Sequence, residues 1–262
     1  MRKSIYTTVI VRVLSRIKIW LRVIKAYVLT FFGVKSNILD SLETVNGILK
    51  GKSLIRFGDG EFGIYAERDI HYQPFSSKLK GEFEQIKHTY EHEGNDCRFI
   101  LAVPKKFMQC SGVELGKKRV FVSSWSDSRL FFKKHFNRTL VYGDAFIFEK
   151  RNKEIYSRIW SQPGDNRTIL FVHNNEKYAE YFEQTYNREV IFLQCPPYDA
   201  FSSVDKILAD VILKINEEGL HPSDVQIVIS AGPAGKVLVY NLSKAGFQCI
   251  DAGHCWDDPL ES

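Results

Sequence analysis

Short apolar runs alternate with longer amphipathic segments along most of the chain. The apolar runs are rich in Val, Ile and Leu without polar alternation, a pattern typical of strands buried on both faces. We expect strands at 53–57, 98–103, 139–142, 168–173, 189–193, 225–230 and 247–250. Helical spacing of apolar residues predicts helices at 38–49, 79–92, 127–136, 176–186, 203–218 and 234–245. Strands separated by helices predict an α/β fold with a Rossmann-like, mostly parallel sheet and flanking helices.

Capping residues suggest where two of these helices begin and end. Ser36 or Asn37 is expected to cap the helix at 38–49, and Gly51 is expected to end it. Asp127 is expected to cap the helix at 127–136. Ligands of parallel α/β sheets bind at the carboxyl ends of strands, so residues that directly follow the strands are the first place to look for chemistry.

The first 35 residues differ from the rest of the chain in charge. They hold eight Lys/Arg and no Asp/Glu, so the formal net charge of +5 comes from this segment and the remaining chain is slightly acidic. On a helical wheel the basic residues share one half, and the other half is apolar and includes Trp20. This pattern predicts a basic amphipathic helix at 1–35 that lies on an anionic membrane surface, followed by a folded domain at 36–262.

Two alternatives for this segment stay open, a core-packed helix with its basic face in water and a pair of strands. The longest uncharged run, 26–34, is too short to span a bilayer, and no signal-peptide cleavage pattern is present. We therefore expect a cytoplasmic protein attached peripherally to the inner face of the cell membrane.

Composition excludes several classes of protein. With 262 residues, 44% of them hydrophobic, and 19 Phe, the chain can bury a large core and is not disordered. The acidic balance outside the first 35 residues argues against nucleic-acid binding. The five cysteines are scattered without a C-x-x-C pair, which argues against a disulfide framework or a zinc cluster and favours a reducing compartment.

The first candidate site follows the strand at 53–57. It contains Arg56, Gly58, Asp59 and Glu61 in close succession. In a turning backbone the two carboxylates can reach one cation, and their hard oxygens suit Mg²⁺ or Mn²⁺. Arg56 offers a guanidinium fork to a phosphate. The alternative is an Asp-Gly turn beside a solvated Glu.

Several blocks of the chain resemble the GT-D-type glycosyltransferases, a bacterial family first catalogued as a domain of unknown function. The blocks stand in the family's order at 55–62, 143–146, 195–201, 231–248 and 250–254. The resemblance implies a Rossmann fold of distinct topology, transfer of a sugar from a nucleotide sugar, and a divalent metal held by Asp59 and Glu61. The chain departs from the family pattern at 172–177 and after His254.

The loop after the strand at 225–230 is the expected binding site for the donor's phosphates. Its glycines let a phosphate or ribose approach the backbone, and the following helix N-terminus favours an anion. The alternative is a strand–helix turn that needs glycines only for packing. The expected donor-binding residues are Arg56, Gly58, Gly232, Pro233, Ala234, Gly235 and Lys236.

Glycosyl transfer also needs a group that stabilises the leaving diphosphate and, in an inverting enzyme, a general base. The candidate catalytic residues are Asp144, Glu61 and His254, with His173 as a weaker one. The expected function is a hexosyl transfer from a UDP-sugar to a glycan or lipid-linked glycan in bacterial surface polysaccharide or glycoprotein assembly. The alternatives are a metal-dependent phosphohydrolase and a non-catalytic, membrane-docked subunit of the same fold.

Overall fold

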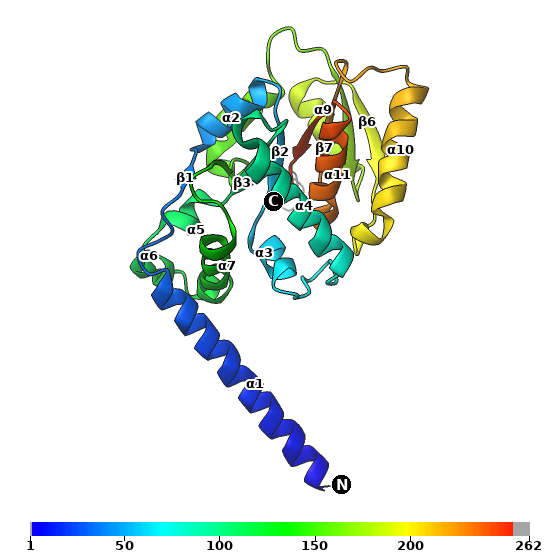
Figure 1. The fold of residues 1–262 in the computed structure, drawn as a ribbon. Coiled ribbons are helices and arrows are strands. Elements are labelled where there is room, and N and C mark those ends of the chain that lie inside the picture. The colour runs from blue at the N-terminus through cyan, green and yellow to red at the C-terminus, as the bar shows by residue number, and fades with distance from the viewer. Residues whose placement is uncertain (1, 254–262) are drawn as a thin grey trace. The chain divides into compact units, whose positions relative to one another are not determined.

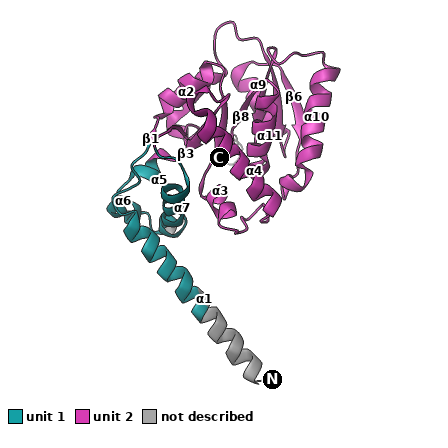
Figure 2. Cartoon of the chain, viewed as in Figure 1, with its two compact units in different colours: residues 1–36, 106–138 teal, residues 37–105, 139–262 magenta. Residues whose placement is uncertain are grey.

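The computed structural model describes residues 2–253, except for the side chains of residues 2–13, 15 and 120. The chain divides into two compact units (Figure 2). One contains residues 1–36 and 106–138, and the other contains residues 37–105 and 139–262. A segment from the middle of the chain, residues 106–138, thus belongs to the same unit as the N-terminal segment.

The larger unit is built on one sheet whose paired strands are all parallel (Figure 1). The strand order is β1-β4-β3-β2-β8-β7-β5-β6. The strands are β1 (Asn37–Ile38), β2 (Ser53–Arg56), β3 (Phe99–Val103), β4 (Val141–Asp144), β5 (Thr168–His173), β6 (Val190–Gln194), β7 (Val225–Ile229) and β8 (Gln248–Asp251). Every residue of β3, β5, β7 and β8 is buried, which confirms the prediction of a sheet covered on both faces.

Helices cover the sheet in two layers. Those of this unit are α2 (Ser41–Leu49), α3 (Asp59–Tyr65), α4 (Ser77–Glu93), α8 (Lys153–Tyr156), α9 (Lys177–Tyr186), α10 (Val204–Glu217) and α11 (Gly232–Lys244). Residues of α2, α8 and α9 share one apolar core with inward-facing strand residues such as Leu54 and Phe171. On the other side α11 packs against β2, β8, α4 and α10, and Figure 1 shows α11 and α4 in front of the sheet. The order of β2, β3 and β4 outward from β8 creates a topological switch point between β2 and β8.

Two local expectations are corrected by the structure. The helix expected at 38–49 begins at Ser41, because Asp40 and Glu43 form a reciprocal capping box and residues 37–38 pair as β1. The turn expected around Asp59 is instead the first turn of α3. A helical backbone at this point changes which carboxylate side chains can lie close to one another.

The smaller unit is helical. It contains α1 (Arg2–Leu29), all but the first residue of α5 (Lys105–Gln109), α6 (Gly112–Lys117) and α7 (Val122–His135). Asp127 lies inside α7 and pairs with Arg22 at 2.8 Å, so the expectation that it caps a helix is wrong. Arg129 is buried and donates hydrogen bonds to the carbonyls of Thr30 and Cys110, which ties the end of α1 to this unit.

The buried side chains at the end of α1 lie on the half of the helical wheel that holds the basic residues. Val23, Ala26 and Thr30 are buried, and on a helical wheel they fall among the basic residues. Among the described side chains, those of the apolar half of α1 are largely exposed, opposite to what the core-packed alternative requires. In the described part of the chain, no helix is both long enough and apolar enough to cross a membrane.

Candidate active site

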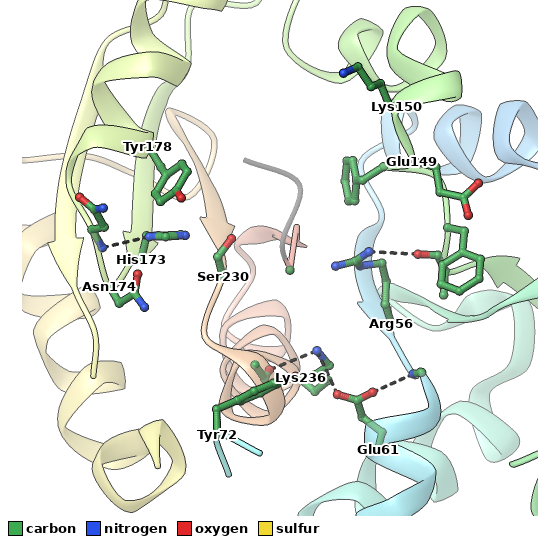
Figure 3. Close-up of a pocket in the computed structure, with 17 residues that line it drawn as sticks. Arg56, Glu61, Tyr72, Glu149, Lys150, His173, Asn174, Tyr178, Ser230 and Lys236 are labelled. Atoms are coloured by element: carbon green, nitrogen blue, oxygen red, sulfur yellow. Dashed lines mark hydrogen bonds and ion pairs between the residues drawn. The ribbon is translucent and has the colours of Figure 1, made fainter. Parts of the chain in front are cut away.

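The carboxyl ends of five strands surround a cavity of about 690 Å³ in the larger unit (Figure 3). Arg56, Ala145, His173, Ser230 and Gly253 line it from the ends of β2, β4, β5, β7 and β8. The cavity lies across the switch point, where open α/β sheets bind ligands. Its volume is in the range that encloses a medium-sized organic molecule.

Arg56 is held at the floor of this cavity by backbone carbonyls. Its Nε donates to the carbonyl of Asp251 at 2.7 Å, and its Nη1 donates to that of Ala145 at 3.0 Å. The guanidinium also lies over the ring of Phe148, 5.1 Å from the ring centroid. The carbonyls at the ends of β8 and β4 therefore fix the direction of the fork, as a phosphate-binding arginine requires.

Lys236 joins two buried carboxylates beside Arg56. Its Nζ lies 3.2 Å from Glu61 Oε1 and 3.2 Å from Asp251 Oδ2, and it donates to the carbonyl of Gly232 at 3.1 Å. All three charged side chains are at most 6% exposed as residues. Burial opposes the charged form, but the carboxylates of Asp251 and Glu61 outweigh it and raise the pKa of Lys236. Lys236 is therefore a cation at neutral pH.

The structure separates the two carboxylates expected to share a metal ion. Glu61 is the third residue of α3, lines the cavity, and accepts from the Gly58 N–H at 2.7 Å as well as from Lys236. Asp59 is exposed in the first turn of α3 and does not line the cavity. Residues two apart on a helix point in different directions. The geometry therefore offers Glu61 alone of the pair to a cation in the cavity.

The loop after β7 enters α11 as expected, with part of it facing the cavity. Gly232 and Lys236 line the cavity, whereas Pro233, Ala234 and Gly235 are buried in the first turn of α11. Gly232 has φ +54°, and a Cβ at this residue would lie 2.7 Å from the ring of Tyr72. A glycine is therefore required here by both backbone and packing.

Asp144, the expected general base, has a carboxylate that is already hydrogen-bonded to other groups of the protein. Its carboxylate accepts hydrogen bonds from the amides of Lys105 and Phe146 and from the hydroxyl of Ser41. Burial raises the pKa of Asp144 above its ordinary value, against these hydrogen bonds. The neighbouring Ala145 and Phe146 line the cavity but Asp144 does not, so its contacts are those of a residue that shapes the wall. His254, the other candidate, lies outside the described residues.

The wall at the end of β5 is polar, since His173, Asn174 and Asn175 line the cavity there. His173 is buried, and its Nδ1 accepts a hydrogen bond from the backbone N–H of Asn175 at 3.0 Å. Tyr178 packs beside this imidazole with 4.6 Å between ring centroids. Across the cavity stands the loop that follows β4 (Figure 3), where Glu149 pairs with Arg151 at 2.6 Å.

Several cavity residues escaped sequence reasoning, among them Glu149, Tyr178 and Tyr72. Glu149 and Tyr178 each lie five residues beyond a strand end, in positions that the rule about carboxyl ends could have suggested. Tyr72 comes from the segment between α3 and α4, and only its long-range packing against Gly232 reveals it. The cavity thus combines cations near a helix N-terminus with neutral donors and aromatic rings, a set suited to a phosphorylated ligand with a polar ring system.

Comparison with known proteins identifies the family of this chain. The family model for the glycosyltransferase GT-D fold matches residues 54–258. A probable glycosyl transferase, Gly, of Streptococcus gordonii is 25% identical over 224 residues, covering 78% of this chain and 30% of that protein. Glycosyltransferase GlyD of Streptococcus pneumoniae serotype 4 is 26% identical over 238 residues, covering 81% of this chain and 26% of that protein. The chain thus spans less than a third of the length of either relative.

Solved structures show the same fold. A structure described as a new glycosyltransferase (DUF1792) from Streptococcus sanguinis is 26% identical with a TM-score of 0.65, covering 84% of this chain and 82% of that one. A structure of domain of unknown function 1792, described as having a distinct glycosyltransferase fold, is 24% identical with a TM-score of 0.67, covering 85% and 79%. With its family model matched over most of its length, the chain belongs to the GT-D glycosyltransferase family.

Proposed function

We propose that this chain transfers a sugar, a hexose in the first instance, from a nucleotide sugar to a glycan or lipid-linked glycan in bacterial surface polysaccharide or glycoprotein assembly. A UDP-sugar is the first donor to test. The observation that carries the proposal is the placement of Arg56, Lys236 and the N-terminus of α11 on one cavity at the switch point. These are the groups that a departing diphosphate needs.

The chemistry follows from where charge develops. As the bond between sugar and diphosphate breaks, negative charge grows on the phosphate oxygens. Arg56 is already oriented by carbonyls, and Lys236 is held by carboxylates, so neither has to reorganise during the reaction. The amides at the start of α11 add a positive potential.

A charge balance supports the expected need for a divalent metal. Arg56 and Lys236 are matched in number by Glu61 and Asp251, so this network carries no net formal charge with which to meet a diphosphate. Glu61 is the residue that would hold Mn²⁺ or Mg²⁺, since it is the carboxylate of the expected pair that faces the cavity. A bound cation would supply positive charge beside the phosphates.

A donor screen tests the transfer. We expect release of the donor's nucleotide, UDP or GDP from a UDP- or GDP-sugar and CMP from a CMP-sugar, from one member of such a panel, dependent on Mn²⁺ or Mg²⁺ and on an acceptor extract. Phosphate or nucleotide release without acceptor would instead indicate the phosphohydrolase. Failure to bind any donor would indicate the non-catalytic subunit.

Glu61→Gln is expected to reduce metal-dependent turnover by about 100-fold, since one preorganised charged group is lost from the site. Thermal unfolding of the variant is the control for folding, because Glu61 also pairs with Lys236. Asp59→Asn is the matched comparison. Equal loss in both variants would show that the two carboxylates share the cation, whereas full activity in both would remove the metal assignment.

The general base stays a proposal among four residues. Asp144, Glu61 and His254 are the candidates from the sequence, and Glu149 is the additional carboxylate on the cavity wall. Asp144→Asn and Glu149→Gln separate two of these candidates, because only removal of the base should abolish transfer while donor binding persists.

We also propose that α1 attaches the protein to an anionic membrane surface. The described side chains of its apolar half are largely exposed, at 49% for Ile17, 68% for Trp20, 61% for Leu21, 51% for Ile24 and 63% for Val28. Arg16, Lys18 and Lys25 are exposed on the same helix. Exposed apolar and basic side chains together are the pattern that binds a lipid interface.

The double variant Arg16→Gln/Lys18→Gln is expected to lower affinity for phosphatidylglycerol vesicles about 30-fold, since each basic residue contributes about 1 kcal/mol at an anionic surface. Trp20→Ser should weaken binding further by removing apolar burial. Lys206→Gln and Leu213→Ser, exposed on α10, are matched controls that should bind like the unmodified chain. Equal sedimentation of all variants with the vesicles would contradict membrane attachment through α1.

A further inference from the structure

Charge follows the two compact units more sharply than it follows the order of the chain. Residues 1–36 hold eight Lys/Arg and no Asp/Glu, and residues 106–138 hold eight Lys/Arg and two Asp/Glu. These two segments form one unit, whose formal net charge is therefore +14. The other unit carries −9, since the whole chain carries +5. The middle segment thus adds +6 to the charge of the N-terminal segment.

The two acidic residues of the helical unit are both bonded within it. Asp127 pairs with Arg22 at 2.8 Å, and the carboxylate of Glu114 accepts from the backbone N–H of Ser111 at 2.7 Å. The exposed basic side chains of the middle segment are those of Lys106, Lys117, Arg119, Lys133, Lys134 and Arg138. A surface of one charge sign attracts a partner of the opposite sign. The unit as a whole, and not α1 alone, therefore suits an anionic partner.

Helix α6 packs against the end of α1 (Figure 2). The hydroxyl of Tyr27 donates to the carbonyl of Gly112 at 2.6 Å, and the backbone N–H of Gly112 donates to the carbonyl of Phe31. A Cβ on Gly112 would overlap the ring of Phe31, and one on Gly116 would lie 3.0 Å from the hydroxyl of Tyr27. The side of α6 that carries Gly112 and Gly116 therefore faces α1.

The adjoining side of α6 is exposed and has the same mixed character as α1. Val113 and Lys117 stand one turn apart on it, and both are exposed, Val113 by 57%. The end of α1 contributes Leu29, and Phe32 follows it with 90% of its surface exposed. On α7, Lys133 is exposed, and its ammonium donates to the carbonyl of Leu29 at 2.8 Å. We call these five residues the junction surface.

We propose that the junction surface binds the same anionic lipid bilayer as α1, with Leu29, Phe32 and Val113 in the interface and Lys117 and Lys133 at the lipid phosphates. The inference rests on the membrane attachment proposed for α1 and extends it to the middle segment of the chain. A lipid interface buries exposed apolar side chains while it attracts basic ones, whereas a soluble polyanion attracts only the charge. The junction surface has both kinds of side chain, so a membrane is the partner that it fits.

Sedimentation of the full chain with phosphatidylglycerol vesicles tests the surface. Val113→Ser/Lys117→Gln should lower affinity at least about 10-fold, because loss of one basic residue alone lowers it about 5-fold and loss of an apolar contact adds to this. Leu213→Ser/Lys206→Gln, on α10 of the other unit, is the matched control and should bind like the unmodified chain. All four side chains are exposed, so thermal unfolding should be unchanged in both variants. Equal affinity of the two double variants would overturn the inference.

The variant Arg16→Gln/Lys18→Gln separates the junction surface from the attachment proposed for α1. Weaker binding of this α1 variant, together with unchanged binding of the α6 variant, would leave attachment through α1 standing and overturn the junction surface. The reverse result would support the junction surface and contradict attachment through α1. Absence of binding by the unmodified chain would overturn both.

The kind of partner is tested with a soluble polyanion. Phe32→Ser leaves every charge in place, so it should weaken binding to phosphatidylglycerol vesicles about 10-fold and leave binding to heparin unchanged. Unchanged binding of this variant to the vesicles would show that charge alone attracts the partner, and would overturn the lipid assignment. Vesicles of phosphatidylcholine, which has no net charge, should bind the unmodified chain at least about 10-fold more weakly. Equal binding to both lipids would overturn the role of Lys117 and Lys133.

Discussion

Replacing Lys236 by Met is expected to lower the free energy of unfolding by about 3–5 kcal/mol. The substitution leaves Glu61 and Asp251 buried with no ammonium between them, and an uncompensated buried charge is costly. The effect is measured from urea-induced unfolding of the full chain. Lys244→Met is the matched control, because Lys244 is exposed near the other end of α11 and is expected to change the free energy by less than about 1 kcal/mol.

The same network allows a rescue experiment. Adding Glu61→Gln to Lys236→Met removes one of the two orphaned charges and should recover part of the lost stability. A Lys236→Met variant as stable as the Lys244→Met control would show that the buried carboxylates do not depend on Lys236. Recovered stability without recovered turnover would separate the structural part of Lys236 from its part in catalysis.

Gly253→Ala is expected to reduce turnover of the nucleotide sugar by about 100-fold, the effect of moving a reacting or stabilising group by about 1 Å. A Cβ on Gly253 would lie 2.0 Å from Nη2 of Arg56, so the guanidinium must leave its place between the carbonyls of Asp251 and Ala145. The measurement is kcat/KM with the donor that the screen identifies. Arg56 is expected to lose its orientation while the sheet around it stays folded.

The control for this substitution is another glycine with a positive φ. Gly246 has φ +98°, and no atom lies within 4 Å of a Cβ built on it. Gly246→Ala therefore carries the backbone cost of a non-glycine residue, about 1–3 kcal/mol, without touching the cavity. Equal loss of activity in the two variants would assign the effect to backbone strain and not to Arg56.

The parallel strands were predictable because burial on both faces leaves a direct mark on the sequence. The runs in β5 and β7 are mostly apolar, and both strands are buried at every position. Boundaries were less accurate where a side chain outside the periodic pattern acts. Asp40 is an example, since its capping box with Glu43 moves the start of α2 to Ser41.

The candidate site was predictable only as far as residues follow strands directly. Arg56, Gly232 and Lys236 were found this way, and all three line the cavity. That Asp59 and Glu61 share one cation stays a prediction. Their spacing in the sequence did not show that the backbone there is helical and that only Glu61 lines the cavity. Tyr72 had no local signal at all, since it reaches the cavity by packing on Gly232, 160 residues away in the sequence.

The hydrophobic pattern was enough to specify an α/β chain with a basic amphipathic N-terminal segment, because each of these properties is local and repeats with the period of one element. Tertiary contacts were needed to decide which functional side chains come together. They bring Lys236 between Glu61 and Asp251, place His173 on the same cavity as Arg56, and leave the described apolar side chains of α1 largely exposed. These are pairings between distant residues, and their energies depend on burial and direction that no short stretch of sequence contains.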